Sequence, residues 1–238
     1  YLLYLAKKFN LRPSAVHYDN TWNSAIASSN IHKMLSSLNF DLYTYVINNK
    51  ESDDIFKSFF LSGVSEIEAP TDLALVEVSY RVASKFKIKY ILDGHSFVEE
   101  GITPLRYNYF DGKYIESIHK KFGELKLKTY PLMTFSNFFK WTVLSGIKRI
   151  RPFWYIEYSK NDAKKILKEN FNWEDYAGHH QENKMSSFYH SVYLLEKFKT
   201  DMSINRLSAQ VREGKISREK AENLLNQTRK PNIELVMY

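Results

Sequence analysis

The segment YILDGHSFVEEG, residues 90–101, decides the expected fold because its character changes abruptly. Residues 90–92 are apolar and favour a β-strand. A polar group follows at once, made up of Asp93, Gly94, His95, Ser96, Glu99 and Glu100. In open α/β sheets, ligands bind beyond the carboxyl ends of the strands. The segment therefore predicts a strand that leads directly into a functional site.

Strands and helices alternate on the amino-terminal side of this segment. SAVHYDN (14–20) and DLYTYVIN (41–48) have strand character, and helices are expected at 24–38 and from Thr71 onward. The order strand, helix, strand predicts right-handed crossovers and a parallel sheet with helices on both faces. The expected fold class is therefore α/β.

The second half of the chain changes character. Residues 135–146 and 159–170 have helical patterns, and the second of these helices is expected to begin at a Ser159 cap. Residues 207–227 are expected to form a final pair of helices that are joined around Gly214. We therefore expect an α/β core at residues 1–130 and a mainly helical region at residues 131–238.

The composition limits the functions of this stretch. Hydrophobic residues make up 44% of the 238 residues, which is enough to fold around a sizeable core. The absence of cysteine excludes disulfides, thiolate metal sites and a cysteine nucleophile within this stretch. The formal charge of +7 favours an anionic partner such as a nucleotide, a nucleotide-sugar or a nucleic acid. No apolar run reaches the roughly 20 residues of a membrane span, so we expect a cytoplasmic protein without membrane insertion.

The start of the chain predicts that part of a domain lies upstream. The sequence begins at Tyr1, within a pattern typical of the end of an amphipathic helix that closes at Asn10. All eight glycines are isolated, so the stretch contains neither a Walker loop nor a GxGxxG fingerprint. If a nucleotide binds at the sheet, its phosphate loop is expected before Tyr1, at a helix N-terminus.

Six segments carry a family resemblance, and they occur in the order AKKFNLRPSAVHYDNTWNS, ILDGHSFVEEGITP, YFDGKYIESIHKKFG, LKTYPLM, GHHQEN and LSAQVREGKISREKA. Together they resemble the N-acetyl sugar amidotransferase family, which are PP-loop ATP pyrophosphatases of bacterial surface-sugar synthesis. The resemblance covers nearly the whole chain and implies a Rossmann-like PP-loop fold. Members carry an SGGxDS phosphate loop just before the first helix of this chain, and cysteines further upstream; this sequence contains neither.

The resemblance implies an ATP-dependent conversion of a sugar acetamido group to an acetamidino group, for O-antigen or flagellin glycans. The implied cofactors are ATP and Mg²⁺. An amide carbonyl is a poor electrophile, so adenylylation of its oxygen would create an imidate-like intermediate that ammonia attacks. Ammonia would come from a separate glutaminase subunit. The implied substrates are diacetamido-uronic acids, or pseudaminic and legionaminic acids, and an oligomer is compatible with this role.

The resemblance assigns the strand-end residues to the nucleotide and the chemistry. Catalytic roles are expected for Asp93, His95, Glu99 and Glu100, and ATP contacts for His17, Asp19, Asn20, Trp22, Gly94 and Ser96. Glu99 and Glu100 are also the expected Mg²⁺ ligands, because Mg²⁺ beside phosphates binds one or two carboxylates. For at least one of these glutamates the alternative is a solvated first helical turn that complements the helix dipole.

Contacts to the sugar or the pyrophosphate are expected from His119, Lys120, Lys121, His179, His180, Glu182, Asn183, Lys197, Lys199 and Arg206. For the lysines and the arginine, an ordinary solvated basic surface is the alternative. The adjacent histidines favour hydrogen bonding over zinc, because neighbouring side chains in an extended loop point in opposite directions and no third ligand is fixed by spacing.

Two other interpretations remain open. A tRNA-modifying PP-loop enzyme would keep the fold, and the basic charge and the final helix pair favour it. A non-catalytic nucleotide-binding module would explain why this stretch lacks a phosphate loop. An upstream SGGxDS motif would support the two enzymes, and its absence would support the module.

Overall fold

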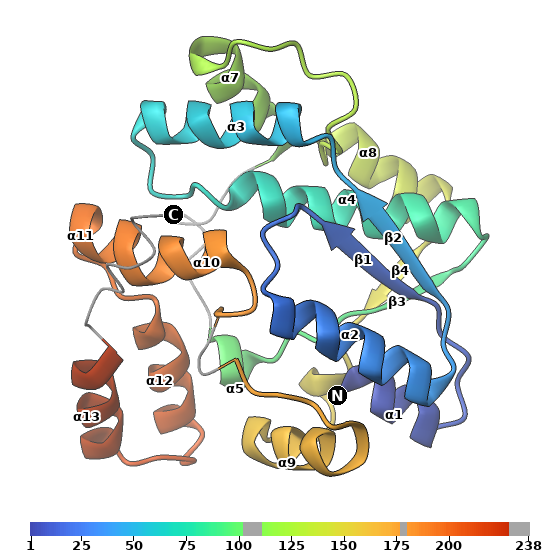
Figure 1. Cartoon of the computed structure of the whole chain (residues 1–238), viewed down its shortest axis with the longest axis vertical. Helices are drawn as coiled ribbons and strands as arrows, with labels where there is room; N and C mark the ends of the chain where they lie inside the picture. The colour runs from blue at the N-terminus through green and yellow to red at the C-terminus, as the bar shows by residue number, and fades with distance from the viewer. Residues whose placement is uncertain (102–110, 177–179, 229–238) are drawn as a thin grey trace.

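The computed structural model describes residues 1–101, 111–176 and 180–228 (Figure 1). It is a mixed α/β structure that is rich in helices. Its helical segments, in chain order, are α1 (Leu2–Lys8), α2 (Ala25–Leu38), α3 (Asn49–Ser62), α4 (Ala69–Lys85), α5 (Phe97–Glu100), α7 (Gly112–Phe122), α8 (Phe135–Phe139), η1 (Lys140–Leu144), η2 (Pro152–Trp154), α9 (Lys160–Phe171), α10 (Lys184–Phe188), η3 (Tyr189–Tyr193), α11 (Leu194–Phe198), α12 (Ser203–Arg212) and α13 (Arg218–Thr228).

Four strands form two small parallel sheets. β1 (Ala15–Asp19) pairs with β2 (Leu42–Val46), and β3 (Tyr90–Leu92) pairs with β4 (Lys148–Ile150). The expected strands and their parallel direction are confirmed. The single continuous sheet that the sequence predicted is not confirmed. Among the described residues, β1 has only β2 as a ladder partner and the short β3 has only β4. The fold class is thus confirmed as mixed α/β, whereas the complete Rossmann-like sheet stays a prediction.

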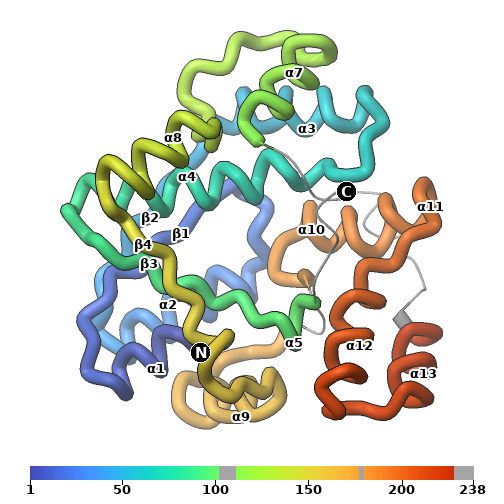
Figure 2. Tube along the Cα trace, turned by 180° about the vertical axis from the view of Figure 1, so that it is seen from behind, coloured from blue at the N-terminus to red at the C-terminus, as the bar shows by residue number. Residues whose placement is uncertain are grey.

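Helices cover both faces of the β1–β2 sheet. α4 lies on one face and α2 on the other, as the views from the front and from behind agree (Figures 1 and 2). α4 begins at Ala69, with Glu68 at the N-cap, and not at Thr71 as the sequence predicted. Pro70 explains this earlier start, because its fixed φ angle suits the first helical turn.

The main core lies between α3, α4 and α7. Ile55 and Phe59 of α3 are fully buried there, together with Val78 of α4 and Ile115 of α7. A second cluster joins α2 to α9 through residues that include Met34, and a third packs the α8–η1 segment against α4. These contacts hold α4 against the β1–β2 sheet, and they place the amino-terminal end of α4 near the polar strand ends.

Buried carboxylates attach the loop after α7 to α3. Asp54 Oδ2 lies 2.6 Å from His119 Nε2 and accepts hydrogen bonds from the backbone N–H groups of Glu124 and Leu125. Although burial alone would raise it, the pKa of Asp54 is lowered because these donors favour the charged form. The carboxylate therefore stabilises the folded protein above its unfolded pKa, and this contribution is lost as the pH falls.

Asp54→Asn is expected to lower the free energy of unfolding by about 2 kcal/mol near neutral pH, because an amide accepts fewer hydrogen bonds and carries no charge. Urea denaturation measures this difference. Asp53→Asn is the matched control, because Asp53 is the exposed neighbour on the same helix. Equal losses for the two variants would contradict the role given to Asp54.

Candidate functional site

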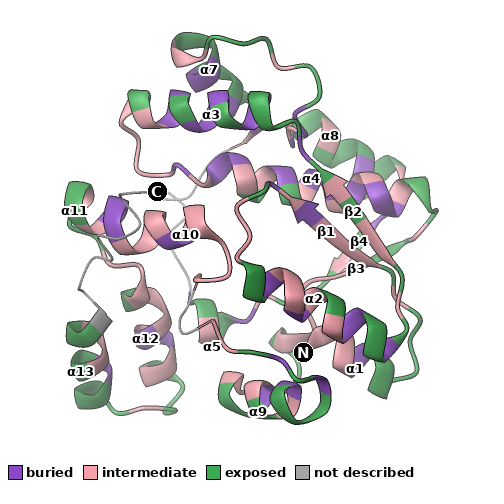
Figure 3. Ribbon diagram, viewed as in Figure 1, coloured by how far each residue is buried: buried purple, intermediate pink, exposed green. Residues whose placement is uncertain are grey.

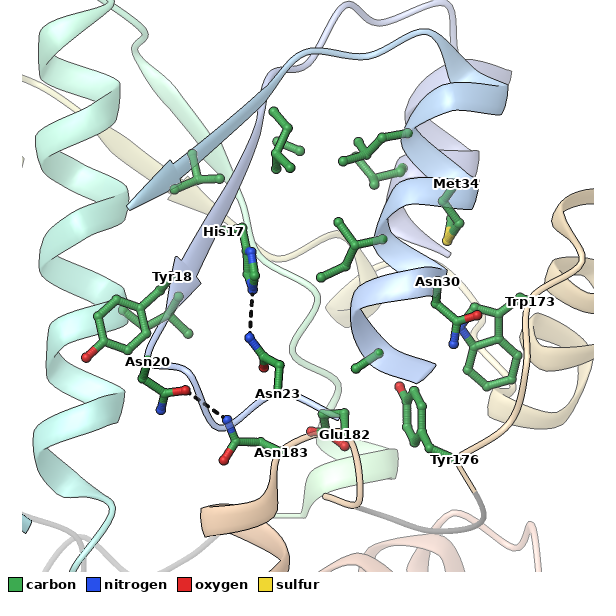
Figure 4. Close-up of a pocket in the computed structure, with 18 of the residues that line it drawn as sticks. His17, Tyr18, Asn20, Asn23, Asn30, Met34, Trp173, Tyr176, Glu182 and Asn183 are labelled. Atoms are coloured by element: carbon green, nitrogen blue, oxygen red, sulfur yellow. Dashed lines mark hydrogen bonds between the residues drawn. The ribbon is translucent and has the colours of Figure 1, made fainter. Parts of the chain in front are cut away.

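A cavity of about 450 Å³ lies between β1 and α2, and Figure 4 shows the side chains around it. Its walls are mainly apolar, and its polar groups are concentrated near the carboxyl end of β1. They include side chains from β1, α2, α4 and the 173–183 segment: His17, Asn20, Asn23, Asn30, Thr71, Tyr176, Glu182 and Asn183. A largely apolar cavity with a few convergent polar groups is the usual form of a small-molecule site.

Two distant segments are joined at this cavity by hydrogen bonds. Asn183 Nδ2 donates to Asn20 Oδ1 over 3.1 Å, although the residues are 163 positions apart (Figure 4). Asn23 and Asn183 also form an antiparallel β-bridge. The expected nucleotide segment around Asn20 and the expected sugar segment around Asn183 therefore lie side by side.

Amide side chains hold the walls of the cavity in place. Asn23 Nδ2 lies 3.1 Å from Nε2 of His17 (Figure 4). Asn30 donates to the Glu174 carbonyl over 2.8 Å and accepts from the Glu174 N–H over 2.9 Å. These two hydrogen bonds position the 173–176 segment, where Trp173 and Tyr176 pack edge to face. The sequence interpretation missed Asn23 and Asn30, because their partners are visible only after folding.

Other residues of the β1 segment shape the turn. Asp19 Oδ1 accepts from the Thr21 N–H over 2.8 Å, and Asn20 Oδ1 accepts from the Trp22 N–H over 3.3 Å. The Trp22 carbonyl accepts from the N–H of Lys184. Asp19 and Trp22 thus have defined local roles at the end of β1, and their ATP contacts stay predictions.

Asp93, at the end of β3, is held by two arginines. Its Oδ2 lies 2.9 Å from Arg151 Nε and 3.1 Å from Arg149 Nε, and its Oδ1 accepts from the His95 N–H. Burial acts to raise the pKa of Asp93, but the Arg151 hydrogen bond and the Arg149 charge lower it below its ordinary value. Asp93 therefore stays charged and fixes the turn that carries His95.

The turn after Asp93 presents an imidazole and a carboxylate together. His95 Nε2 lies 3.5 Å from Glu100 Oε2, and its Nδ1 accepts a hydrogen bond of 3.1 Å from Trp154 Nε1. Burial raises the pKa of the Glu100 carboxyl group, and the nearby His95 opposes this shift. Ser96 is buried at the start of α5, and a Cβ at Gly94 would meet only an ordinary contact with Phe153. The pair of His95 and Glu100 has the composition of a proton-transfer site.

The two adjacent glutamates have different surroundings. Glu99 Oε2 accepts from Gln210 Nε2 of α12 over 3.2 Å, and its Oε1 accepts from the Lys160 N–H at the start of α9 over 3.4 Å. Glu99 thus joins α5 to two other helices, whereas Glu100 faces His95. Among the described residues, no group of three His, Asp or Glu side chains is arranged to hold a metal ion. Shared Mg²⁺ binding by Glu99 and Glu100 stays a prediction.

Gly101 permits the close approach of α12 to the end of α5. Its φ angle is +75°, and a Cβ atom there would lie 2.5 Å from the backbone carbonyl of Asn205 and 2.9 Å from the N of Arg206. The expected pyrophosphate residue Arg206 is therefore held beside α5 by the backbone.

Gly101→Ala is expected to lower the free energy of unfolding by about 3 kcal/mol, because the added methyl group meets rigid backbone and the φ angle suits only glycine. Gly146→Ala is the matched control: its φ is +62°, and no atom lies within 4 Å of the added Cβ. Its expected loss is about 1 kcal/mol. Urea denaturation compares the two, and equal losses would contradict the tight packing of α12 on α5.

A partly buried cluster lies at the amino-terminal end of α4, and of its members the sequence interpretation named only His180. We call Glu68, Asp72, His180, Ser186 and His190 the Glu68 cluster. The Ser186 hydroxyl donates to Glu68 Oε1, His190 Nε2 lies 3.6 Å from Glu68 Oε2, and the rings of His180 and His190 stack with centroids 4.2 Å apart. Acids in a first helical turn ordinarily complement the helix dipole at the surface, so their spacing alone gave no sign of these contacts with the histidines.

The Glu68 cluster has strongly shifted acid–base properties. Burial, and then the charge of Asp72, raise the pKa of Glu68 to about 7. The protein around Asp72 raises the pKa of its carboxyl group as well, although this residue is exposed. Burial and the neighbouring His180 lower the pKa of His190 to about 3. A carboxyl group with a pKa near neutral beside a neutral imidazole is typical of functional sites.

The expected sugar-side residues divide between the cavity and the Glu68 cluster. His180 belongs to the cluster, and its Nδ1 lies 3.7 Å from Glu182 Oε1. Burial would raise the pKa of Glu182, but the His180 hydrogen bond helps to lower it overall. Asn183 caps α10 by accepting from the N–H groups of Met185 and Ser186. His179 lies outside the described residues.

The remaining expected residues lie away from the cavity. His119 is buried beside Asp54, and the exposed Lys120 and Lys121 share its helix α7, on the far side of α4 from α2 and the cavity (Figure 1). Lys197 packs on the Tyr193 ring, and Lys199 forms an exposed pair with Glu196. The structure does not bring these side chains together with the β1 and β3 ends.

Among the described residues, no helix has the length and apolar character needed to cross a membrane.

Comparison with known proteins connects the carboxyl-terminal part of the chain with a pathway. No curated protein matches the chain. Residues 182–236 match the family model described as LPS biosynthesis protein WbpG-like, C-terminal domain. The matched segment begins with Glu182 and Asn183 at the cavity, and this match indicates involvement in lipopolysaccharide biosynthesis.

Proposed function

We propose that this protein is an ATP-dependent amidotransferase that converts a sugar acetamido group to an acetamidino group during lipopolysaccharide O-antigen synthesis. The observation that carries the proposal is the contact between Asn20 and Asn183 at one cavity. It joins the end of β1, the expected nucleotide side, to the segment where the match to lipopolysaccharide biosynthesis begins. A nucleotide and a sugar bound on these two sides would meet near this contact.

In the proposed reaction, the acetamido oxygen attacks the α-phosphorus of ATP, and pyrophosphate leaves. Ammonia then adds to the imidate carbon, AMP leaves with the former carbonyl oxygen, and loss of a proton gives the amidine. The pair of His95 and Glu100 is suited to accept that proton, because it joins an imidazole to a carboxylate with a raised pKa. Asp93 and its arginines keep the turn with His95 in place.

Mg²⁺ that binds beside phosphates usually has only one or two protein carboxylates as ligands, and this site can supply that number. Glu100 fits that role better than Glu99, whose two oxygens already accept hydrogen bonds from α9 and α12. When bound, the ion would neutralise charge on the triphosphate. The apolar cavity walls would exclude water, which would otherwise hydrolyse the adenylylated intermediate.

A cytoplasmic location and a separate source of ammonia are parts of the same proposal. ATP is the co-substrate, and the 238 residues contain no cysteine for thiol-dependent glutamine hydrolysis. In this proposal a glutaminase subunit supplies the ammonia, and the complete protein is expected to use concentrated ammonium salts alone.

The proposal is tested by incubating the complete protein with ATP, Mg²⁺, ammonium and a nucleotide-linked diacetamido sugar. Sugar-dependent release of AMP and pyrophosphate is the expected result. Release of ADP and phosphate would contradict the adenylylation step. Tight tRNA binding without sugar-dependent pyrophosphate release would instead support the tRNA-modifying alternative.

A further inference from the structure

An unusually apolar surface lies along α8 and η1. Phe135 and Leu144 have exposed fractions of 72% and 73%, and Val143 has 59%. Phe138 and Phe139 are nearly half exposed. We call these five residues the α8 face. Trp141 points inward and is buried in the cluster that packs against α4, so the segment is anchored while the α8 face stays in solvent.

The segment lies on the outside of the molecule. In the views from the front and from behind, α8 runs next to α4, on the side opposite to α12 and α13 (Figures 1 and 2). Much of its surface is exposed in Figure 3. Exposed apolar side chains gathered on one short segment differ from the scattered ones on ordinary surfaces, and they typically mark a binding surface.

Exposed lysines lie on η1 itself and on the segments that pack beside it. The exposed lysines of this region are Lys85, Lys87, Lys89, Lys140 and Lys148. Lys89 Nζ donates to the Ser145 carbonyl at the end of η1 over 2.7 Å, which places its charge beside Leu144. The backbone N–H of Lys148 in turn donates to the Lys89 carbonyl. In the part of the chain that the structure describes, none of these five lysines forms a salt bridge.

The sequence shows the same bias over a longer stretch. Residues 125–156 contain four lysines, two arginines that pair with Asp93, and no aspartate or glutamate. The whole chain has 27 acidic residues in 238 positions, so a run of this length without any is a local feature and not an average property. An occupant of this surface must therefore be apolar at its centre and negatively charged around it.

These features favour a lipid surface over a protein partner. Protein interfaces are depleted in lysine, and their strongest contacts come mainly from tryptophan, tyrosine and arginine. The α8 face instead combines phenylalanine and leucine with lysines that form no salt bridge to any residue that the structure describes. That combination is typical of helices that lie in the interface of an anionic bilayer, where the apolar side chains enter the acyl boundary and the lysines contact the headgroups.

We propose that the α8 face docks this protein reversibly on an anionic lipid bilayer. Phe135, Val143 and Leu144 insert between the headgroups, and Lys89, Lys140 and Lys148 contact the lipid phosphates. Insertion of this kind is peripheral and needs no spanning helix. The cavity and the His95–Glu100 pair lie elsewhere on the molecule, so this proposal is independent of the proposed reaction.

The test is co-sedimentation of the complete protein with vesicles of phosphatidylcholine, with or without phosphatidylglycerol. Binding is expected to be at least tenfold stronger with the anionic lipid and to weaken as salt is added. The Phe135→Ser/Leu144→Ser variant removes the two most exposed apolar side chains, and it is expected to lose about tenfold in binding. The Lys140→Glu/Lys148→Glu variant is expected to lose at least as much.

Two matched variants distinguish docking from general stickiness. Leu61→Ser removes a side chain that is 59% exposed on α3, and Lys165→Glu/Lys168→Glu makes the same charge change on exposed positions of α9. Both are expected to bind vesicles like the native protein, and circular dichroism checks that every variant is folded. Failure of the native protein to bind anionic vesicles would overturn the proposal. So would equal losses in the α9 and Lys140→Glu/Lys148→Glu variants, because these would show only a net-charge effect.

Discussion

The Glu68→Gln variant is expected to gain stability relative to the native protein as the pH rises. Burial raises the pKa of Glu68 from 4.5 to about 7, so the folded state binds its proton more tightly than the unfolded state does. In the native protein, the stabilisation from protonated Glu68 is fully present below the unfolded pKa and is lost as the pH rises through the folded pKa. The variant has no such group and does not lose it. A shift of this size corresponds to about 3 kcal/mol.

The measurement is the difference in free energy of unfolding between the variant and the native protein. Urea denaturation determines it at pH values from below 4.5 to above 7, the two pKa values of Glu68. The difference is used because other charged and titratable groups, Asp72, His180, Glu182 and His190, lie near the same carboxyl group. Glu116→Gln, on the exposed side of α7, is the control and is expected to give a nearly flat difference. A flat difference for Glu68→Gln as well would show that its carboxyl group is not buried as the structure has it.

The Glu100→Gln variant is expected to lose about a hundredfold in turnover, because the amide cannot take a proton with His95 and cannot ligate Mg²⁺ well. Its stability should change little, since the Glu100 side chain is 45% exposed. The loss in turnover should be larger at low Mg²⁺ concentration. Steady-state release of pyrophosphate in the presence of sugar and ammonium measures this effect.

Glu99→Gln is the matched comparison at the adjacent position. A glutamine there still accepts hydrogen bonds from Gln210 and from the Lys160 N–H, so a loss of less than tenfold is expected. Equal losses of turnover in the two variants, both relieved by high Mg²⁺ concentration, would contradict this division. They would instead support the sequence-based prediction that both carboxylates bind the ion.

The sequence was sufficient for features that depend on local patterns. Alternating apolar segments predicted β1, β2 and β3, and the Ser159 cap is confirmed by its hydrogen bond to the Asp162 N–H. The pairing of the strands into two separate sheets was not predicted, because ladder partners such as β3 and β4 are far apart in the chain.

The candidate site was predictable only in part for the same reason. The polar ends of β1 and β3 were visible, but the partners that define their roles come from distant segments: Asn183 for Asn20, and Arg149 and Arg151 for Asp93. Adjacent residues such as Glu99 and Glu100 look equivalent in a sequence, yet packing directs them to different neighbours. Likewise, His119 appeared to belong to a basic motif until folding placed it against Asp54.

The most direct test of the proposed function is the identity of the sugar product. The complete protein is incubated with ATP, Mg²⁺, isotopically labelled ammonium and a nucleotide-linked diacetamido sugar, and the sugar is analysed by mass spectrometry and NMR. The account predicts that labelled nitrogen replaces the oxygen of one acetamido group, in proportion to the AMP released. An unchanged sugar under conditions where the protein hydrolyses ATP would contradict it.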